Sequence, residues 1–360
     1  MKICFIGNNA NGEKISDGGR IKMRTIMSML EKNGHDINVV DLVNWKYRFF
    51  SIIKQVKKAL IENDFIFLMA GPNGSRVLIP ILVFLNRKKR KKLIFCPVGL
   101  GTIDKIVRDL DGKQLNDFIN CVDFFGKKDK KMGNKLSYFY KVLPENSVLF
   151  ELYNKFYNLN NLALLPNFRK GLIHKRVYQK RDNNLNIVFL SRVCEEKGVL
   201  DLINVVKKLN KSNFNITLDI YGEIQFKNKN VLFEELDKEI RYNGECDNSQ
   251  SYDILLNHDL LCLPTKYYGE GTPGVVVESF FVGTPCLISN YSQVRSLIKN
   301  GFNGFVYEFQ NNSELEKRII EIYKTDNVSM QVMVDNIFEV AQNYTEQSVF
   351  NLLSNLLKEQ

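Results

Sequence analysis

Short apolar runs alternate with longer amphipathic segments along the whole chain. In the first half, the apolar runs predict β-strands over residues 2–7, 36–41, 64–70 and 93–98. Residues 19–34 place apolar side chains at the spacing of one helical face, and Gly34 is a residue type that ends helices. Strands that alternate with helices favour an α/β fold with parallel sheets.

The same pattern starts again in the second half. Short strands are predicted over residues 186–190, 216–221, 240–242, 260–263, 285–289 and 305–307. Helical segments lie between them, for example 200–209 and 275–282, and a last apolar helical pattern runs from Val349 to Leu357. Residues 166–185 are polar, basic and weakly periodic, which is typical of a linker.

Two such patterns joined by a linker predict two Rossmann-like domains. The chain has 360 residues, which is long for one domain and natural for two. We expect one domain over residues 1–170, a second over residues 183–340, and a C-terminal helix at 341–360 that packs back on them.

Charge is distributed unevenly between the halves. Residues 1–180 hold 33 Lys and Arg against 15 Asp and Glu, whereas residues 181–360 hold 17 against 25. A basic first half suggests an anionic partner, such as a membrane surface, a phosphorylated lipid or nucleic acid. No basic strand with interleaved aromatic residues and no recognition-helix pattern is present, so nucleic acid is not expected.

Six consecutive basic residues, Arg87–Lys92, form the sharpest positive cluster. Two interpretations stay open: a solvated helix end, or a contact with anionic lipid headgroups. The apolar run 77–85 just before it could insert into the membrane interface or form a buried helix. We expect peripheral contact between the basic N-terminal domain and an anionic membrane.

The seven cysteines are scattered and never form a C-x-x-C pair. Several lie inside apolar runs, so they are interpreted as reduced core thiols rather than disulfides or zinc ligands. The amino terminus lacks a signal-peptide pattern, and no apolar run is long enough to cross a bilayer. These features favour a cytoplasmic protein, peripheral at most to the inner face of the membrane.

Three predicted strand ends of the second half carry residues suited to a phosphorylated ligand. In parallel α/β domains, ligands bind at the carboxyl ends of the strands. After strand 186–190, Arg192 and Lys197 could converge on a diphosphate, although the same segment could be an ordinary solvated loop. After strand 216–221, Gly222 is interpreted as a turn residue.

The third strand end, after residues 260–263, is the richest in candidate ligand contacts. Gly269, Gly271 and Gly274 allow a close backbone approach, and Val275 begins a helix. Glu270 lies in the loop and Glu278 one turn inside the helix, where each carboxylate could accept hydrogen bonds from sugar hydroxyls. The apolar neighbours of Glu278 predict a buried helix start rather than a solvated one.

The order and spacing of these pieces resemble the nucleotide-sugar-binding half of the family-four, or group one, retaining glycosyltransferases of the GT-B fold. In that family a strand is followed by S/G-R-x-x-x-x-K-G, and the matching residues are Ser191, Arg192, Lys197 and Gly198. An E-x7-E motif follows, and the matching residues are Glu270 and Glu278. The family continues as E-A-x-A-x-G-x-P, which Gly283 and Pro285 match while Ser279 and Phe281 replace the alanines.

The resemblance implies a fold and a set of residue roles. It implies an α/β GT-B structure, in which two Rossmann-like domains face each other across a cleft. Arg192 and Lys197 would bind the donor diphosphate and stabilise the leaving nucleotide, and Glu270 would contact the donor sugar as a catalytic residue. Glu278 would hold the ribose. Backbone N–H groups would lie near the distal phosphate, and they belong to Gly271, Thr272, Gly274 and Val275.

The first half resembles the family's acceptor domain over a shorter stretch. Gly18 and Gly19 follow the first strand, as a G-G loop does in the family, and would face the donor phosphates or the acceptor. A structural turn is the alternative. Many members carry a histidine after the fourth strand, but residues 95–102 contain none. That role is unfilled here, or backbone groups and Thr102 take it.

Two formal motifs are set aside. Asp109 and Asp111 form D-x-D, but in a polar segment rather than after a core strand, and residues 7–12 do not match G-x-G-x-x-G. We therefore expect no metal and no cofactor, since the nucleotide-sugar is a substrate.

The function expected from this resemblance is that of an enzyme, a glycosyltransferase of the hexosyltransferase type. It would move a sugar from a nucleotide-sugar donor to a glycan or lipid-linked acceptor, in cell-surface polysaccharide synthesis. Two alternatives stay open: a non-catalytic sugar-nucleotide-binding partner of a synthesis complex, and a GT-B nucleotide-sugar epimerase.

Overall fold

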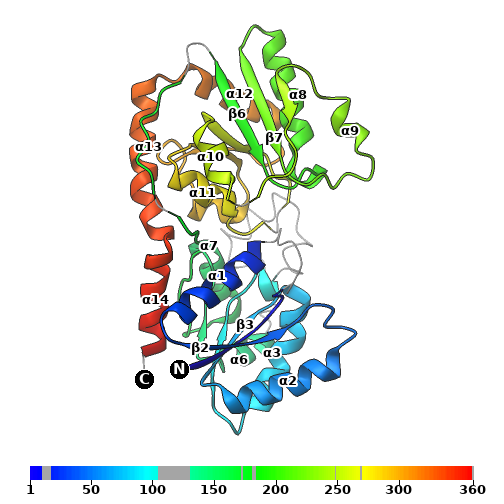
Figure 1. Cartoon of the computed structure of the whole chain (residues 1–360), viewed down its shortest axis with the longest axis vertical. Coiled ribbons are helices and arrows are strands. Elements are labelled where there is room, and N and C mark those ends of the chain that lie inside the picture. The colour runs from blue at the N-terminus through cyan, green and yellow to red at the C-terminus, as the bar shows by residue number, and fades with distance from the viewer. Residues whose placement is uncertain are drawn as a thin grey trace. The chain divides into compact units, whose positions relative to one another are not determined.

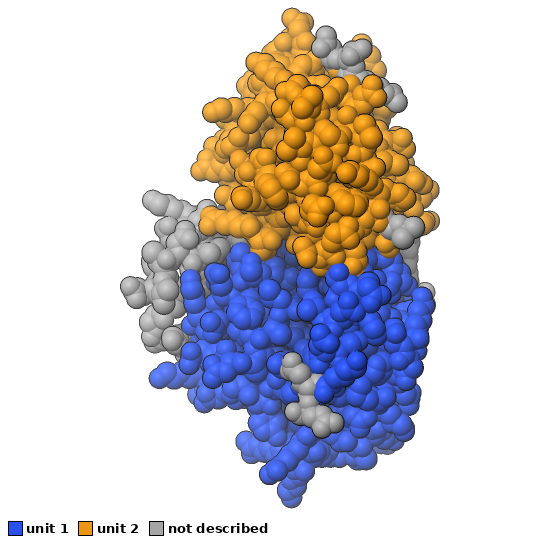
Figure 2. Space-filling model, turned by 90° about the vertical axis from the view of Figure 1, so that its left-hand side faces the viewer, with its two compact units in different colours: residues 1–170, 269–272, 346–360 blue, residues 171–268, 273–345 orange. Residues whose placement is uncertain are grey.

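The computed structural model describes residues 1–9, 18–103, 130–171, 173–180, 184–247, 249–267 and 270–358. The chain forms two compact units (Figure 2). Unit 1 comprises residues 1–170, 269–272 and 346–360, and unit 2 comprises residues 171–268 and 273–345.

Unit 1 is built on a five-stranded parallel sheet in the order β2-β1-β3-β4-β5 (Figure 1). Its strands are β1 (Lys2–Gly7), β2 (Asp36–Asp41), β3 (Phe65–Met69), β4 (Lys92–Phe95) and β5 (Lys141–Val142). Its described helices are α1 (Gly18–Lys32), α2 (Phe49–Glu62), α3 (Pro72–Asn86), the 3-10 turn η1 (Gly101–Ile103), α6 (Lys130–Leu136), α7 (Ser147–Tyr157) and α14 (Glu346–Lys358).

The core of unit 1 joins the start of the chain to its end. Strand residues such as Phe5 and Phe67 pack with Ile26 of α1 and with Val349 and Leu353 of α14, so α1 and α14 cover the same face of the sheet. Side chains alternate between the two faces of a strand. Helices α2 and α3 pack against each other next to this sheet.

Unit 2 contains a six-stranded parallel sheet in the order β11-β10-β9-β6-β7-β8. Its strands are β6 (Leu185–Leu190), β7 (Ile216–Tyr221), β8 (Ile240–Tyr242), β9 (Leu260–Leu263), β10 (Cys286–Ser289) and β11 (Phe305–Tyr307). Its described helices are α8 (Val199–Lys211), α9 (Asn230–Phe233), α10 (Ser251–Leu256), α11 (Gly274–Phe281), α12 (Asn312–Lys324) and α13 (Asn327–Ala341), with 3-10 turns η3 (Glu195–Lys197), η4 (Ser292–Ser296) and η5 (Gln342–Tyr344).

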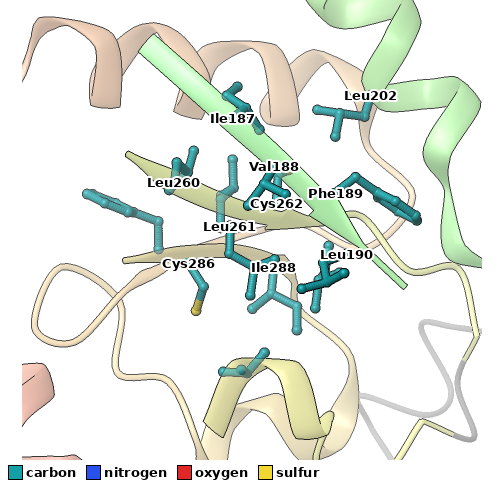
Figure 3. Close-up of a cluster of buried hydrophobic side chains, with 14 of the residues drawn as sticks. Ile187, Val188, Phe189, Leu190, Leu202, Leu260, Leu261, Cys262, Cys286 and Ile288 are labelled. Atoms are coloured by element: carbon teal, nitrogen blue, oxygen red, sulfur yellow. The ribbon is translucent and has the colours of Figure 1, made fainter. Parts of the chain in front are cut away.

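The central strands of unit 2 are buried on both faces. Figure 3 shows neighbouring strand residues on both faces of the sheet: Ile187 of β6 pairs with Leu260 of β9, and Val188 pairs with Leu261, and all four are fully buried. Strands covered by helices on both sides need continuous apolar runs rather than alternation, which is the pattern that the sequence shows here.

The α/β fold with parallel sheets is confirmed, and most predicted elements match within one or two residues. One strand is shorter than expected: β4 ends at Phe95, because Pro97 has no N–H group to donate to a neighbouring strand. Strand β5 was not predicted, since two residues are too few to produce a periodic pattern.

A buried carboxylate, Asp219 of β7, links three segments of unit 2. Arg241 donates to both of its oxygens at 2.9 Å, Asn243 donates at 2.8 Å, and the His258 Nε2 lies 3.1 Å away. Burial by itself would raise the pKa of Asp219, but the hydrogen bonds from His258, Arg241 and Asn243 outweigh it and hold that pKa well below its usual range.

We expect Asp219→Asn to lower the free energy of unfolding by about 2 kcal/mol at pH 7, because charge-assisted hydrogen bonds are lost. The folded-state pKa lies below the unfolded value of about 3.9, so the ionised carboxylate contributes fully above that value and loses its contribution as the pH falls. Urea unfolding of both proteins at pH 7 and pH 3 measures this. A difference that does not shrink at pH 3 would contradict the assignment.

Candidate functional site

The loop after β6 carries two of the expected phosphate-binding cations. The Lys197 side chain is buried in the short η3 turn, whereas Arg192 is exposed and donates from Nη1 to the Gln225 Oε1 at 3.2 Å. Gly198 follows at a φ of 72° and begins α8. Both cations therefore lie in the loop that follows the carboxyl end of the central strand β6.

This loop packs directly against the chain that follows β9. The Glu196 carbonyl accepts the backbone N–H of Lys266 at 2.8 Å and the Thr265 hydroxyl at 3.4 Å. A Cβ on Gly198 would lie 2.0 Å from the Pro264 carbonyl oxygen. Because β6 and β9 are neighbours, the two predicted ligand loops of unit 2 meet at one edge of its sheet.

Helix α11 positions the second glutamate of the E-x7-E motif. The helix begins at Gly274 after Pro273, which provides no side-chain cap, so Gly274 and Val275 form a helix N-terminus of the kind that attracts anions. Val276, Val277 and Phe280 are fully buried, and Glu278 is itself only 9% exposed. The predicted buried helix start is confirmed.

The first glutamate of the motif lies in the other unit. Glu270 is partly exposed, and Gly271 and Thr272 follow it in the same segment of unit 1. The Thr272 N–H donates to the Glu145 carboxylate at 2.8 Å. Gly18 and Gly19 form the first turn of α1, also in unit 1.

The predicted residues thus form two sets. Unit 2 contains Arg192, Lys197, Gly274, Val275 and Glu278, and unit 1 contains Gly18, Gly19, Glu270, Gly271 and Thr272. Gly269 and the aspartates Asp109 and Asp111 lie outside the described residues. Among the residues that the structure does describe, no group of three or more His, Cys, Asp or Glu side chains could hold a metal ion.

Gly222 has the structural role expected of it. It adopts a φ of 134°, and a Cβ there would lie 1.9 Å from the Ser191 carbonyl oxygen. The Tyr242 hydroxyl donates to the Gly222 carbonyl at 2.9 Å. This glycine lets the loops after β6 and β7 approach each other.

Thr102 is enclosed in unit 1. The Tyr157 hydroxyl donates to the Thr102 Oγ1 at 2.9 Å, and that Oγ1 lies 3.2 Å from the Tyr153 hydroxyl. Thr102 is 3% exposed, so its side chain serves packing. The Thr102 hydroxyl is therefore engaged by Tyr153 and Tyr157.

Three polar residues of unit 1 were missed by sequence reasoning: Lys22, Glu145 and Asn167, all buried near Thr272. Glu145 follows β5, which is too short to be recognised as a strand. The sequence does contain one local signal next to Glu145. The following residue, Asn146, caps α7, whose apolar run begins directly afterwards.

None of the helices in the described part of the chain is both long and apolar enough to cross a membrane.

Comparison with known proteins gives a family match in the second half of the chain. Residues 173–337 match the family model described as glycosyl transferases group 1. A 41.2 kDa protein from the cps region of Klebsiella pneumoniae is 26% identical over 40% of this chain and 37% of that protein. An Escherichia coli enzyme named as a UDP-Gal:alpha-D-GlcNAc-diphosphoundecaprenol alpha-1,3-galactosyltransferase is 22% identical over 48% of this chain and 44% of that enzyme.

The matched stretches therefore span less than half the length of these curated relatives. The similarity in fold to solved structures covers more of the chain than these sequence matches do. HepE of Anabaena, solved in complex with UDP, matches over 100% of both chains with a TM-score of 0.71 and 13% identity. The resemblance to group one glycosyltransferases and the GT-B fold are thereby confirmed.

We expect Gly198→Ala to destabilise the protein by about 1–3 kcal/mol, because the added Cβ would collide with the Pro264 carbonyl at a left-handed φ. Thermal unfolding measures the loss. Gly18→Ala is the matched control, since a Cβ there meets nothing within 4 Å. Equal unfolding temperatures for the two variants would show that the loops after β6 and β9 are not in contact.

Proposed function

We propose that the chain is a retaining glycosyltransferase of the hexosyltransferase type, because residues 173–337 match the family model of the glycosyl transferases group 1. It moves a sugar from a nucleotide-sugar donor to a glycan or lipid-linked acceptor, in cell-surface polysaccharide synthesis. The N-terminal domain handles the acceptor and the C-terminal domain the donor.

One observation carries this proposal: the loops after β6 and β9 are in backbone contact at the carboxyl edge of the sheet, where Lys197 follows β6 and α11 begins after β9. Lys197 supplies a positive charge and α11 supplies N–H groups, and both suit a diphosphate. Buried Glu278 supplies a carboxylate for ribose hydroxyls.

The chemistry follows from the charge that develops during transfer. When the bond between the sugar and the nucleoside diphosphate breaks, negative charge grows on the departing phosphate. Arg192 and Lys197 stabilise that charge, and the N–H groups of Gly274 and Val275 add to it. Glu270 accepts hydrogen bonds from hydroxyls of the donor sugar, which orients it for the incoming acceptor.

The names of the similar proteins support the substrate classes. The Escherichia coli relative is named for a UDP-Gal donor and an alpha-D-GlcNAc-diphosphoundecaprenol acceptor, and HepE has been solved with UDP-glucose. By this likeness we assign a nucleotide-sugar as the donor and a glycan or a lipid-linked sugar as the acceptor.

We expect Glu270→Ala and Lys197→Ala each to reduce kcat/KM by about 100-fold or more while the proteins stay folded, because each removes a contact to the charged or reacting part of the donor. Transfer is measured from a panel of radiolabelled UDP-, GDP-, ADP- and TDP-sugars to membrane-extract acceptors. Glu234→Ala and Lys227→Ala, at exposed positions of unit 2, are the controls.

Wild-type turnover in either site variant would overturn the site assignment. Donor conversion by the wild-type protein without an acceptor would indicate an epimerase instead. Donor binding, seen as thermal stabilisation, without transfer to any acceptor would indicate a non-catalytic partner of a synthesis complex.

We also propose that unit 1 contacts an anionic membrane at the cytoplasmic face. Helices α2 and α3 lead into the neighbouring strands β3 and β4, so their C-terminal ends lie at the same edge of the sheet. We call this region the basic edge and define it by the exposed residues Lys57, Ile61, Phe84, Arg87, Lys88 and Arg90. The exposed Glu62 beside them is paired with Lys58 at 3.8 Å.

The basic edge combines charge with exposed apolar side chains. Ile61 is 64% exposed and Phe84 is 66% exposed, and the Arg87 guanidinium lies 5.7 Å from the centre of the Phe84 ring. Exposed aromatic and aliphatic groups beside cations suit the interface of an anionic bilayer. Lys92 is different, because its ammonium lies over the rings of Phe65 and Tyr140.

We expect the variant Arg87→Gln/Lys88→Gln/Arg90→Gln to bind vesicles of phosphatidylcholine and phosphatidylglycerol up to about 100-fold more weakly, since each cation contributes about 1 kcal/mol near such a surface. Vesicle sedimentation measures the binding. The control removes three exposed lysines of unit 2, Lys211, Lys227 and Lys229. Equal loss in both variants, or no loss in the first, would contradict a specific basic edge.

A further inference from the structure

A buried ion pair lies beneath the Gly271–Thr272 segment in unit 1. Lys22 of α1 and Glu145, which follows β5, have side chains only 7% and 9% exposed, and the Nζ and Oε2 atoms are 3.7 Å apart. The Lys22 ammonium also donates to the Leu165 carbonyl at 3.0 Å. Each buried charge therefore has a partner, which burial demands.

Glu145 uses its two oxygens for different partners. Oε2 faces Lys22, and Oε1 accepts the backbone N–H of Thr272 at 2.8 Å. A carboxylate held by a buried cation is a strong and fixed acceptor, because it cannot turn to solvent. The amide of Thr272 is thereby tied to α1 through a single side chain.

Thr272 is bound at its carbonyl and its hydroxyl as well. Asn167 donates from Nδ2 to the Thr272 carbonyl at 2.8 Å, and the Asn146 Nδ2 lies 3.4 Å from the Thr272 Oγ1. Asn146 is itself held, because its Oδ1 accepts the Leu149 N–H as the cap of α7. Side chains here provide the hydrogen bonds that a helix or strand would otherwise provide.

The absence of a side chain at Gly271 allows the Glu145 carboxylate to approach the backbone of this segment. A Cβ at this position would lie 2.2 Å from the Glu145 Oε1. Glu270 is the next residue toward the amino terminus, so its backbone is joined to a segment that is held at three points.

From this geometry we propose that Glu145 and Asn167 are positioning residues that set the place of Glu270; the catalytic part of this inference rests on the proposed function. Neither residue is assigned a contact with the reacting atoms. They act through the Gly271–Thr272 backbone, and Lys22 acts through Glu145. We call the hydrogen bonds from Glu145 and Asn167 to Thr272 the clamp. Displacement of a catalytic group by about 1 Å can cost about 100-fold in rate, so loss of a clamp hydrogen bond should lower the rate of transfer.

The first test is independent of catalysis. Amide hydrogen exchange of the peptide containing Thr272 is compared in the wild type, Glu145→Ala, Glu145→Gln and Asn167→Ala. We expect faster exchange at Thr272 in Glu145→Ala, and slower exchange in Glu145→Gln than in Glu145→Ala, because glutamine retains an acceptor oxygen. Glu151→Ala, at an exposed position of α7, is the control.

The second test is kinetic. We expect Glu145→Ala and Asn167→Ala to lower kcat by about 10- to 100-fold with little change in the KM for the donor, because Arg192, Lys197 and Glu278 are untouched. Glu145→Gln should recover part of kcat, which a general loss of stability would not predict. Asn167→Ala leaves the Lys22–Glu145 pair intact, and so tests the clamp even where Glu145→Ala fails to fold.

Wild-type exchange at Thr272 together with wild-type kcat in folded Glu145→Ala or Asn167→Ala would overturn the proposal. Faster exchange with unchanged kcat would overturn its catalytic part. If the wild-type protein transfers no sugar from any donor, the proposed function fails, and the exchange experiment still decides whether the clamp exists.

Discussion

Backbone contact between adjacent loops is the constraint on which the donor side of this protein depends. At Gly198 and Gly222 the loops after β6, β7 and β9 come so close that no Cβ fits between them. Parallel strands bring their carboxyl ends to one edge, but they leave the distance between the following loops open. The two glycines allow that close approach, and Lys197 directly precedes one of them.

In unit 1 a loop segment is held by hydrogen bonds from buried side chains rather than by backbone contact between loops. Among the described strands none pairs with the Gly271–Thr272 segment, and buried side chains of Glu145 and Asn167 supply its hydrogen bonds instead. Such a polar cluster is stable only when every member has a partner, because an unpaired buried charge costs several kcal/mol. Lys22 meets that requirement for Glu145.

Both arrangements depend on parts of the chain that are far apart in sequence. Lys22 lies in the first helix, Glu145 follows the last strand of the first sheet, and Thr272 comes more than a hundred residues later. The C-terminal helix α14 likewise completes the core of unit 1, at the start of the chain. Cores of this kind form only after distant segments have met.

The local chemistry of the chain was determined by its sequence. Apolar runs specified nine of the eleven described strands to within one residue at either end. The central strands among them are apolar throughout because they are buried on both faces. The buried setting of Glu278 could also be predicted, since its neighbours on α11 are valine and phenylalanine. Strand β5 was not predicted because it is very short. The end of β4 was predicted wrongly because the strand stops just before a proline rather than at a change in polarity.

Only the tertiary structure decided which polar residues meet. Nothing in the residues around Glu145, Asn167 or Lys22 marks them as partners of Thr272, because no local period or spacing links positions so far apart. The same holds for Gly198, whose need to be glycine arises from a carbonyl on the neighbouring loop. Local patterns determine helices, strands and their buried faces, whereas hydrogen bonds and close approaches between loops exist only once the sheets have assembled.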